Sequence, residues 1–449
     1  MALIIFIENR GKTSFWNPIA LDLQRRGHEI SWIVQNPQYI PDAFKGDIHM
    51  HVLPFPLNQS KAQPTQDEAW VKQHYPALIT DRGRTYFGAG TTHYAHYTAE
   101  IERVLQLEKP DLVVGESTLF HELIAIDLCR TAGILYVHPC ANRYPSERFS
   151  IFSFDTQNPA AGSGDIWLDA KARDQVERIA TGREVPFYMR SPSRFEKLGR
   201  TLHLAAARAT VWRGRLRGER YNTPSLHSKL SLRRQLKKNL QSWQALESLP
   251  SDPARTLLYP LQMQPEANID VWGRPHSDQT QLIRAMLAAA PADVQVAIKA
   301  NPKSKYEVSI ELLALATQEP RVCLIPLTMS MAQAQACTVG TLTVSGTVGF
   351  EAALGKGRCL SLRHPLIERN FPSLHASSVA DGVQRLLNDP QAGLGGTEVG
   401  MQLIQQLVKD SFAGLVSEPL YHPACIDPKN VILVADALHA LMPASISTK

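Results

Sequence analysis

Three residues, Ser345, Gly346 and Thr347, follow a short apolar run and lead into a helical stretch in the sequence VSGTVGFEAALGKG. Such a turn is suited to holding a phosphate group, because glycine lets the backbone approach closely and a helix N-terminus offers free N–H groups. The two hydroxyls add donors, and Glu351, one turn into the predicted helix, can accept hydrogen bonds from sugar hydroxyls. Taken alone, the turn is also explained as an ordinary helix N-cap.

Polar side chains also follow three other predicted strands in the second half of the chain. The segments LQMQPE, IKANPKSK and LIPLTMS each end an apolar run with amide, carboxylate, ammonium or hydroxyl groups. Ligands of parallel α/β sheets bind at the carboxyl ends of the strands, so these side chains should meet the Ser-Gly-Thr turn at one edge. The lysines of IKANPKSK would then neutralise the same anion. Neither a GxGxxG fingerprint nor a Walker loop is present in the sequence.

Both halves of the chain alternate short apolar strands with helical stretches, the pattern of parallel α/β sheets. In the first half ALIIFI, HEISWIV, DLVVGES and ILYVHP are predicted strands, and a second alternation runs from TLLYPLQ to RCLSL. The predicted fold class is therefore α/β, with two Rossmann-like domains whose parallel sheets face across a cleft. The predicted boundaries are 1–240 for the first domain, including a basic helical segment at 190–240, 250–425 for the second, and 426–449 for a C-terminal helix and tail.

Length and composition agree with two domains of a globular protein. A chain of 449 residues exceeds one compact core, and its hydrophobic fraction of 44% is ordinary. No apolar stretch approaches the roughly 20 residues of a membrane span. The start, MALIIFIENRGK, lacks a basic region and a cleavage site, and is predicted to be a buried strand instead of a signal peptide. The six cysteines are scattered without a CxxC pair, which predicts reduced thiols and a cytoplasmic protein.

Positive charge is concentrated in one segment. Residues 190–238 contain 14 Lys/Arg against two Glu, whereas the whole chain has a net charge of +5. One interpretation is a solvated helical face; the other is a surface for anionic lipid, where each basic residue adds about 1 kcal/mol. Nucleic acid is disfavoured as a partner, because no aromatic residues are interleaved as a stacking platform.

The order of YPLQMQPE, KANPK and VSGTVGFEAALGKGRCLSL resembles the GT-B-fold glycosyltransferases of capsule and lipopolysaccharide biosynthesis, related to Kdo and sialic-acid transferases. Members read close to PLQxQPE, KxHP and SGTxGxEAxxxGKP, and the resemblance covers residues 255–365. It implies transfer from a nucleotide-sugar donor to a surface glycan. CMP-Kdo or a related CMP-ulosonic acid is the expected donor, with a UDP-sugar as the alternative.

In those relatives the His-Pro pair and the serine element grip the CMP portion. Asn301 and Pro302 stand in the place of that pair, so a neutral amide replaces an imidazole. The donor-binding residues that the resemblance and the strand ends together imply are Gln264, Glu266, Lys299, Asn301, Lys303, Ser330, Ser345, Gly346, Thr347 and Glu351.

The resemblance also implies that the first domain supplies the acceptor site and a catalytic carboxylate. Glu116, at the end of the strand in VVGES, is the first candidate, and Glu8 in IENRGK is its rival. Such a carboxylate would deprotonate the acceptor hydroxyl or attack the anomeric carbon. The structural alternative is a glutamate held by a helix dipole. Arginines would suit an acidic sugar, because guanidinium pairs with carboxylate in a bidentate manner. The expected acceptor-binding residues are Asn9, Arg10, His138, Arg143 and Arg148.

Other enzyme classes lack their motifs in this sequence. Neither HExxH nor paired Cys/His spacing is present for zinc, and there is no GxSxG elbow. No metal and no cofactor are expected, since the nucleotide sugar is a substrate. The expected partners are the donor, a glycan or lipid-linked glycan acceptor and an anionic inner-membrane surface. Two alternatives stay open: a sugar-nucleotide epimerase, which needs no acceptor, and a non-catalytic polysaccharide assembly or export protein.

Overall fold

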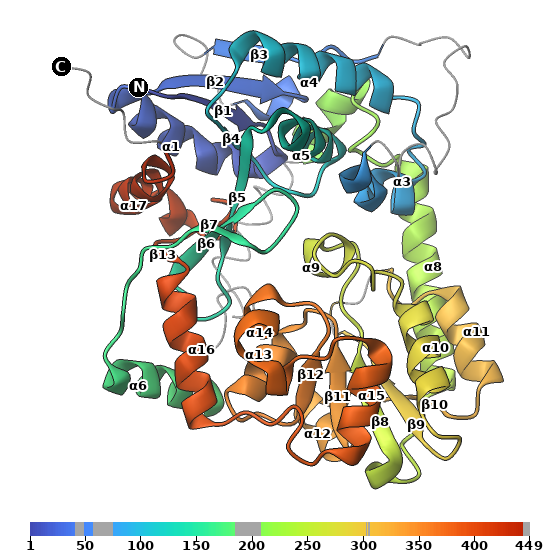
Figure 1. Ribbon diagram of the computed structural model, residues 1–449. Coiled ribbons are helices and arrows are strands. Elements are labelled where there is room, and N and C mark those ends of the chain that lie inside the picture. Colours follow the sequence, from blue (N-terminus) through green and yellow to red (C-terminus); the bar gives the residue numbers. More distant parts are fainter. Residues whose placement is uncertain (41–48, 57–74, 185–207, 302, 304–305, 443–449) are drawn as a thin grey trace. The chain divides into compact units, whose positions relative to one another are not determined.

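The computed structural model describes residues 1–40, 49–56, 75–184, 208–301, 303 and 306–442. By its contacts the chain divides into two compact units, each built around one sheet (Figure 1). The first unit combines Met1–Ile166, Pro186–Ser225 and Gln406–Lys449, and the second combines Trp167–Val185 and Leu226–Gln405.

The first unit contains an eight-stranded sheet whose order is β13-β6-β5-β4-β1-β2-β3, with β7 paired to β6. From β3 to β5 the pairs are parallel, and β6 runs antiparallel to β5, β7 and β13. Its strands are β1 (Leu3–Ile7), β2 (Glu29–Val34), β3 (His49–Val52), β4 (Leu112–Val114), β5 (Leu135–Ala141), β6 (Arg148–Ser153), β7 (Pro159–Ala161) and β13 (Phe412–Ala413).

Helices cover both faces of this sheet, which explains why its strands β1 and β4 are apolar at every position. Ile4 and Phe6 of β1 belong to the core cluster under α1 and α17, while Ile5 and Ile7 belong to the cluster under α4 and α5. Successive strand residues point to opposite faces, so the run LIIFI fills two cores. The α-helices of this unit include α1 (Thr13–Arg25), α3 (Arg82–Phe87), α4 (Tyr94–Glu108), α5 (Phe120–Ala132) and α17 (Pro428–His439).

The C-terminal part of the chain belongs to the first unit, which the predicted boundaries did not foresee. Helix α17 packs on α1, where Arg26 pairs with Asp436 at 2.5 Å and His28 Nε2 lies 2.8 Å from His439 Nδ1. Residues 167–185 and 226–240 lie in the second unit, whereas the prediction assigned them to the first domain. Within the predicted basic segment and the tail, residues 190–207 and 443–449 lie outside the described residues.

The second unit contains a parallel five-stranded sheet of order β10-β9-β8-β11-β12. The prediction of two Rossmann-like units with parallel sheets is confirmed. The strands are β8 (Thr256–Pro260), β9 (Gln295–Lys299), β10 (Val322–Leu324), β11 (Gly340–Thr343) and β12 (Cys359–Ser361). The helices are α6 (Asp169–Ala180), α8 (Leu226–Ala245), α9 (Ala267–Asp270), α10 (Gln279–Ala289), α11 (Ile310–Gln318), α12 (Met331–Ala336), α13 (Thr347–Ala353), α14 (Pro365–Asn370) and α15 (Val379–Asn388). Helix α16 (Thr397–Lys409) leads from the second unit into the first.

Two further predictions concern cysteines and membrane spans. All six cysteines are free thiols in the structure, four of them buried. Over the described ranges, no helix has both the length and the hydrophobicity that crossing a membrane requires.

Candidate functional site

The strand ends that the sequence singled out in the second unit lie next to one another. Strands β9, β8 and β11 are neighbours in the sheet, and Lys299 at the end of β9 is in register with Pro260 at the end of β8. The loops after these three strands therefore leave the same edge of the sheet, where ligands of such folds bind.

Hydrogen bonds join the loop after β8 to the turn after β11. The Gln262 amide donates to Ser345 Oγ at 3.1 Å, and the Ser345 backbone N–H donates back to Gln262 Oε1 at 3.2 Å. The Ser345 hydroxyl in turn donates to the carbonyl of Asn268 at 2.6 Å. Ser345 is buried, so its hydroxyl holds the turn in place, and the partly exposed Gly346 and Thr347 are better placed to touch a ligand.

The Gln264 side chain forms a further set of hydrogen bonds within the loop after β8. Its amide nitrogen donates to Asp270 Oδ1 at 2.6 Å and to the Ser277 carbonyl at 3.0 Å. Its oxygen accepts from Gln279 Nε2 at 2.9 Å. Gln279 was not predicted from the sequence: it occupies the first position of α10, and its buried side chain also bonds both backbone groups of Gln262. Gln264 thus supports the loop from inside.

Gly346 is required by close packing, since its φ of −67° suits any residue. A Cβ atom at this position would lie 2.6 Å from Thr343 Oγ1, closer than real Cβ contacts come. Glu351 is partly buried on α13, one turn after Thr347.

The predicted cationic residues after β9 differ in exposure. Lys299 is buried and donates from Nζ to the Ala300 carbonyl at 3.2 Å. Burial lowers the pKa of Lys299, and the Glu247 carboxylate acts in the opposite direction. Asn301 Oδ1 accepts from the backbone N–H of Lys303 at 2.8 Å, and the Lys303 side chain is exposed. Pro302, the other half of the predicted pair, lies outside the described residues.

Two of the predicted donor-binding residues begin helices. Glu266 is exposed before α9, and its backbone N–H donates to Asp270 Oδ2 at 2.9 Å. Ser330 and Gln333 form a capping box at the start of α12, with the Gln333 backbone N–H donating to Ser330 Oγ at 3.3 Å. The Ser330 hydroxyl is thereby used locally, while the Glu266 carboxylate faces solvent.

In the first unit, Glu116 follows β4 at the carboxyl edge of the sheet and forms an ion pair. Its Oε1 lies 2.8 Å from Lys12 Nζ, and its side chain is 20% exposed. Burial raises the pKa of Glu116 above its ordinary value, and Lys12 opposes the shift. Burial acts to lower the pKa of Lys12, but Glu116, together with Cys140 and Glu418, acts in the opposite direction, and the pKa is raised. The Glu116 side chain is partly exposed, although its Oε1 is buried beside Lys12.

Glu8, the rival candidate, is 1% exposed, and its carboxylate accepts hydrogen bonds from the backbone. Its Oε1 accepts from the Arg10 N–H at 2.7 Å and its Oε2 from the Asn36 N–H at 2.9 Å. Burial raises the pKa of Glu8 to about 7, although both backbone N–H groups lower it. Glu8 therefore joins the loops after β1 and β2, and it is more deeply buried than Glu116.

A third carboxylate, Glu122, was not predicted from the sequence. Its two oxygens accept from the backbone N–H groups of Glu116, Thr118 and Leu119 and from the side chains of Asn9 and Thr118, at 2.8–3.3 Å. The signal was present in FHELIAI, where a glutamate stands among apolar helical residues in the position of a capping box. Glu122 fixes the loop that carries Glu116.

Glu418 adds a carboxylate from the far end of the chain. A Cβ at Gly11 would lie 2.8 Å from Glu418 Oε2, so the side chain reaches the loop that also carries Lys12. Burial raises the pKa of Glu418, with Lys12 lowering it and Glu116 raising it. Sequence reasoning missed this residue, because SEPLY follows no predicted strand.

The two predicted acceptor residues beside Glu8 are bonded within the first unit. Asn9 Nδ2 donates to Glu122 Oε1 at 2.8 Å. Arg10 has a left-handed φ of 43°, and its guanidinium donates to the carbonyl of Asn222. Asn222 also donates to His121 Nδ1, whose ring is buried and has its pKa lowered to about 4 by burial.

The other predicted acceptor residues lie on β5, on β6 and in the loop between them. His138 is buried, its Nε2 lies 3.0 Å from the Thr156 carbonyl, and burial lowers its pKa to about 4. Arg148 bonds Ser411 Oγ at 2.8 Å and Asp165 at 2.8 Å, which fastens β13 to β6. These bonds give both residues a structural role, and acceptor binding by the partly buried Arg143 stays a prediction.

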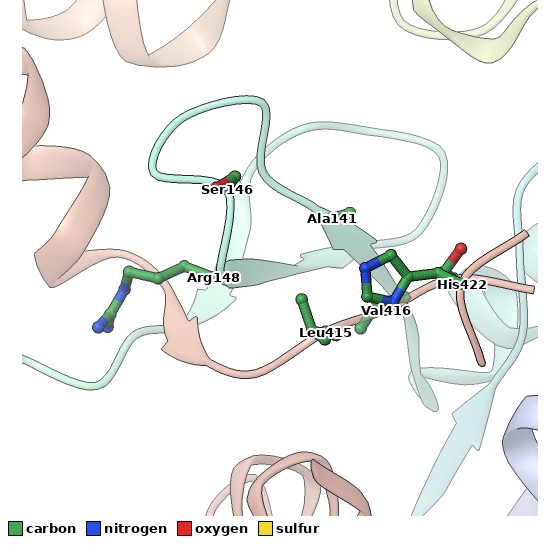
Figure 2. A pocket seen from close by; sticks show the side chains of 7 residues that line it. Ala141, Ser146, Arg148, Leu415, Val416 and His422 are labelled. Atoms are coloured by element: carbon green, nitrogen blue, oxygen red, sulfur yellow. The ribbon is translucent and has the colours of Figure 1, made fainter. Parts of the chain in front are cut away.

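A small pocket lies where β5 and β6 meet the segment after β13 (Figure 2). Figure 2 shows the Arg148 side chain extending away from His422. The pocket does not bring Arg148 to the predicted carboxylates. Its lining comprises Ala141, Ser146, Arg148, Leu415, Val416, Ser417 and His422.

Comparison with known proteins gives likenesses of fold at low similarity. No family model matches the sequence, and no curated protein matches it. A UDP-GlcNAc 2-epimerase from Methanocaldococcus jannaschii is 16% identical, with 91% of this chain and 99% of that chain covered and a TM-score of 0.26. The Neisseria meningitidis UDP-GlcNAc 2-epimerase bound to UDP-GlcNAc is 12% identical, with 98% and 100% covered and a TM-score of 0.25.

The glycosyltransferase VinC in complex with dTDP is 13% identical, with 97% of this chain and 100% of that chain covered and a TM-score of 0.23. At these scores the likenesses say nothing about activity. The function is therefore inferred from the residues of the two sheet edges.

Proposed function

We propose that this protein is a metal-independent glycosyltransferase that moves a sugar from a nucleotide-sugar donor onto a capsule or lipopolysaccharide glycan. The observation that carries the proposal is the pair of hydrogen bonds between Gln262 and Ser345. These bonds join the two segments whose sequences, PLQMQPE and SGTVGFEAALGKG, resemble those of GT-B transferases.

The donor-binding role is assigned to the carboxyl edge of the second sheet. Gly346 and Thr347 are partly exposed in a turn that Ser345 fixes, and backbone N–H groups at such a turn suit a diphosphate or phosphate ester. Lys303 supplies an exposed positive charge after the neighbouring strand, and the exposed Glu266 carboxylate can accept from sugar hydroxyls. A CMP-ulosonic acid is the proposed donor, and a UDP-sugar is the alternative.

Glu116 is the proposed catalytic carboxylate, and Glu8 is assigned a supporting role. Glu116 is partly exposed and its loop is fixed by Glu122, so it is both reachable and oriented. Burial raises the pKa of Glu116, and its ion pair with Lys12 acts against that shift by favouring the ionised form, which a base or nucleophile needs. Electrostatic stabilisation of the departing nucleotide would come from the donor edge.

An anionic membrane surface is the proposed location of the acceptor, with the protein on its cytoplasmic side. Helix α8 exposes Leu226 and Leu230 one turn apart, with the exposed Arg233 and Lys237 on the turns that follow. This combination of apolar and basic side chains on one helix suits a lipid headgroup region. Binding to anionic liposomes that persists unchanged after the Lys/Arg of 213–238 are neutralised would contradict this location.

The first experiment is a thermal-shift screen with CMP, UDP, GDP and their sugar conjugates, followed by a transfer assay with the stabilising sugar nucleotide. A ligand at a hundred times its Kd adds about 2.7 kcal/mol to the free energy of unfolding. Stabilisation by CMP favours the ulosonic-acid donor, and stabilisation by UDP or GDP changes the donor and keeps the class. Ser345→Ala should weaken the response, with the exposed Ser377→Ala as its control.

The assay also separates the two alternative functions. An epimerase would convert the sugar nucleotide with no acceptor present, whereas a transferase would release the nucleotide as acceptor is glycosylated. An assembly or export protein would do neither and would tolerate Glu116→Gln. Failure of every nucleotide to stabilise the protein would remove the donor site from the proposal.

A further inference from the structure

The outer edge of the first sheet carries two histidines and a glutamate that the proposed function does not use. His49 and His51 lie on β3, the last strand at that edge, and residues two apart in a strand project from the same face. Glu108 is the last residue of α4. Its Oε1 lies 2.9 Å from His51 Nε2 and 3.4 Å from His49 Nδ1. We propose that these three side chains bind one divalent transition-metal ion, best matched by Zn²⁺.

The strand and the helix that carry the three side chains are held together by core packing. His51 is in register with Ile33 of β2, and Ile33 belongs to the same core cluster as Val104 and Leu105 of α4. The end of α4 is thereby packed against the face of the sheet from which the histidines project. A metal at this place would join the edge strand to the helix.

The distances between the ligand atoms suit a small coordination sphere. The three atoms all lie within 4.8 Å of one another. Zinc with bonds of about 2.0–2.1 Å in tetrahedral geometry separates its ligands by about 3.3 Å. The 3.4 Å between His49 Nδ1 and Glu108 Oε1 is close to this value. The 2.9 Å between His51 Nε2 and Glu108 Oε1 is shorter, so these two atoms would have to move apart slightly. The two imidazole rings lie 4.4 Å apart between centroids at 62°, so they are not stacked.

The chemistry of the donor set points to zinc over harder ions. Two imidazole nitrogens and one carboxylate oxygen form the His₂Glu set that zinc accepts, with water completing the sphere, whereas Mg²⁺ and Ca²⁺ prefer oxygen. The nearby cation Arg103 is paired with Glu100 at 3.2 Å. Without a metal, Glu108 Oε1 could accept hydrogen bonds from both imidazoles, and the metal titration distinguishes that arrangement from coordination.

The experiment uses the full chain without a histidine tag, stripped with EDTA and dialysed. Titration with ZnCl₂ by calorimetry should show one site per chain. Loss of an outer-shell partner costs about 10- to 100-fold in metal affinity, so His51→Ala and Glu108→Gln should each cost more than about 100-fold. His227→Ala, on the exposed side of α8, is the matched control and should leave the affinity unchanged. Co²⁺ should give the intense visible absorption of a tetrahedral site and lose it in His51→Ala.

Absence of zinc binding to the wild type, or binding that His51→Ala and Glu108→Gln leave unchanged, would overturn the site. Unfolding of each variant in EDTA is compared with that of the wild type. If a variant is unfolded, the cobalt spectrum of the wild-type chain decides: an octahedral spectrum contradicts the proposal. This inference does not rest on the glycosyltransferase activity, because its readout is metal affinity.

Discussion

The carboxyl edges of the two sheets are built from different chemistry. At the first-unit edge, ionisable groups dominate. Lys12 pairs with Glu116, Glu418 also acts on Lys12, and Glu8 and Glu122 hold the neighbouring loops. Burial raises the pKa of each of the four carboxyls. At the second-unit edge, neutral amides and hydroxyls bond one another, as Gln262 does with Ser345.

This difference separates two tasks. Carboxyls whose pKa is raised by burial titrate closer to neutral pH than exposed carboxyls do, which suits acid–base catalysis. Amides and hydroxyls that satisfy one another keep a fixed geometry over the same pH range, which ligand binding requires. Activity and stability should therefore depend on pH and on charged side chains at the first-unit edge. At the second-unit edge they should depend on the size and fit of the side chains.

Glu116→Gln should have the largest effect on activity. If Glu116 acts as base or nucleophile, kcat should fall by about 10²- to 10⁴-fold, because the amide cannot accept the proton or form the intermediate. The nucleotide affinity should stay the same, since donor binding is assigned to the other edge. Steady-state transfer kinetics and a nucleotide titration measure the two quantities.

The control for Glu116→Gln is Glu102→Gln, an exposed glutamate of α4. Lys12→Met sharpens the same comparison, because it removes the ammonium 2.8 Å from Glu116. The pKa of Glu116 should rise further, and the acidic limb of the pH–rate profile should move to higher pH. Equal kcat for Glu116→Gln and wild type would show that catalysis does not use this edge.

Glu8 should make the stability of the chain depend on pH. Burial raises its pKa from 4.5 to about 7, so the protonated form is favoured on folding. That contribution is fully present below pH 4.5 and is lost as pH rises through about 7. Across this window the loss is up to about 3 kcal/mol. Glu8→Gln should remove this pH dependence. Between pH 4.5 and pH 8, the free energy of unfolding of the variant, measured in urea, should therefore rise relative to that of the wild type.

The buried histidines act in the opposite direction, so the difference between variant and wild type is the quantity to measure. His121 and His138 have pKa values lowered to about 4, and their contribution is lost as pH falls through 6.5 toward 4. Both are present in each protein and cancel in the comparison. A difference that stays constant with pH would show that Glu8 is ionised throughout.

Gly346→Ala tests shape at the second edge. The added Cβ would lie 2.6 Å from Thr343 Oγ1, and Thr343 is buried, so we expect a loss of about 1–3 kcal/mol in the free energy of unfolding. Gly396→Ala is the matched control, because nothing lies within 4 Å of its Cβ and its φ is not left-handed. It should be neutral or stabilising by up to about 1 kcal/mol. Similar urea midpoints for the two variants would contradict the close packing at Gly346.

The second sheet and four parallel strands of the first were predictable from the sequence, because they depend on local patterns. The strands β3, β6, β7 and β13 of the first sheet were not predicted. Apolar runs such as LIIFI specify strands filled on both faces, and the rule for parallel sheets then places their ends at one edge. The same rule predicts that the loop after β8 and the turn after β11 lie together, as they do. It also placed Glu116 at the end of a strand.

The partners of individual polar side chains were not predictable, because they come from distant parts of the chain. Arg148 follows a strand and resembled a ligand-binding arginine, yet its partner Ser411 lies 263 residues away on the segment that adds β13. Asn9 is bonded to Glu122 across 113 residues, and Glu418 reaches Gly11 from the C-terminal part. Sequence patterns show that a polar residue stands at an edge, and long-range packing decides whether it faces a ligand or the protein.

The smallest expected effect is the coupling between Gln262 and Ser345. Their side chains meet directly, and Gln262 bonds Gln279 through its backbone alone, so truncation of its side chain removes chiefly the contact with Ser345. In a double-mutant cycle of Gln262→Ala and Ser345→Ala, we expect a coupling of about 0.5–1.5 kcal/mol in the free energy of unfolding. Gln262→Ala with Ser330→Ala is the control pair, because Ser330 caps α12 by itself and should add independently. A coupling of zero in the first pair would mean that the two loops are held by their backbones, and the resemblance of the two sequence segments would lose its structural counterpart.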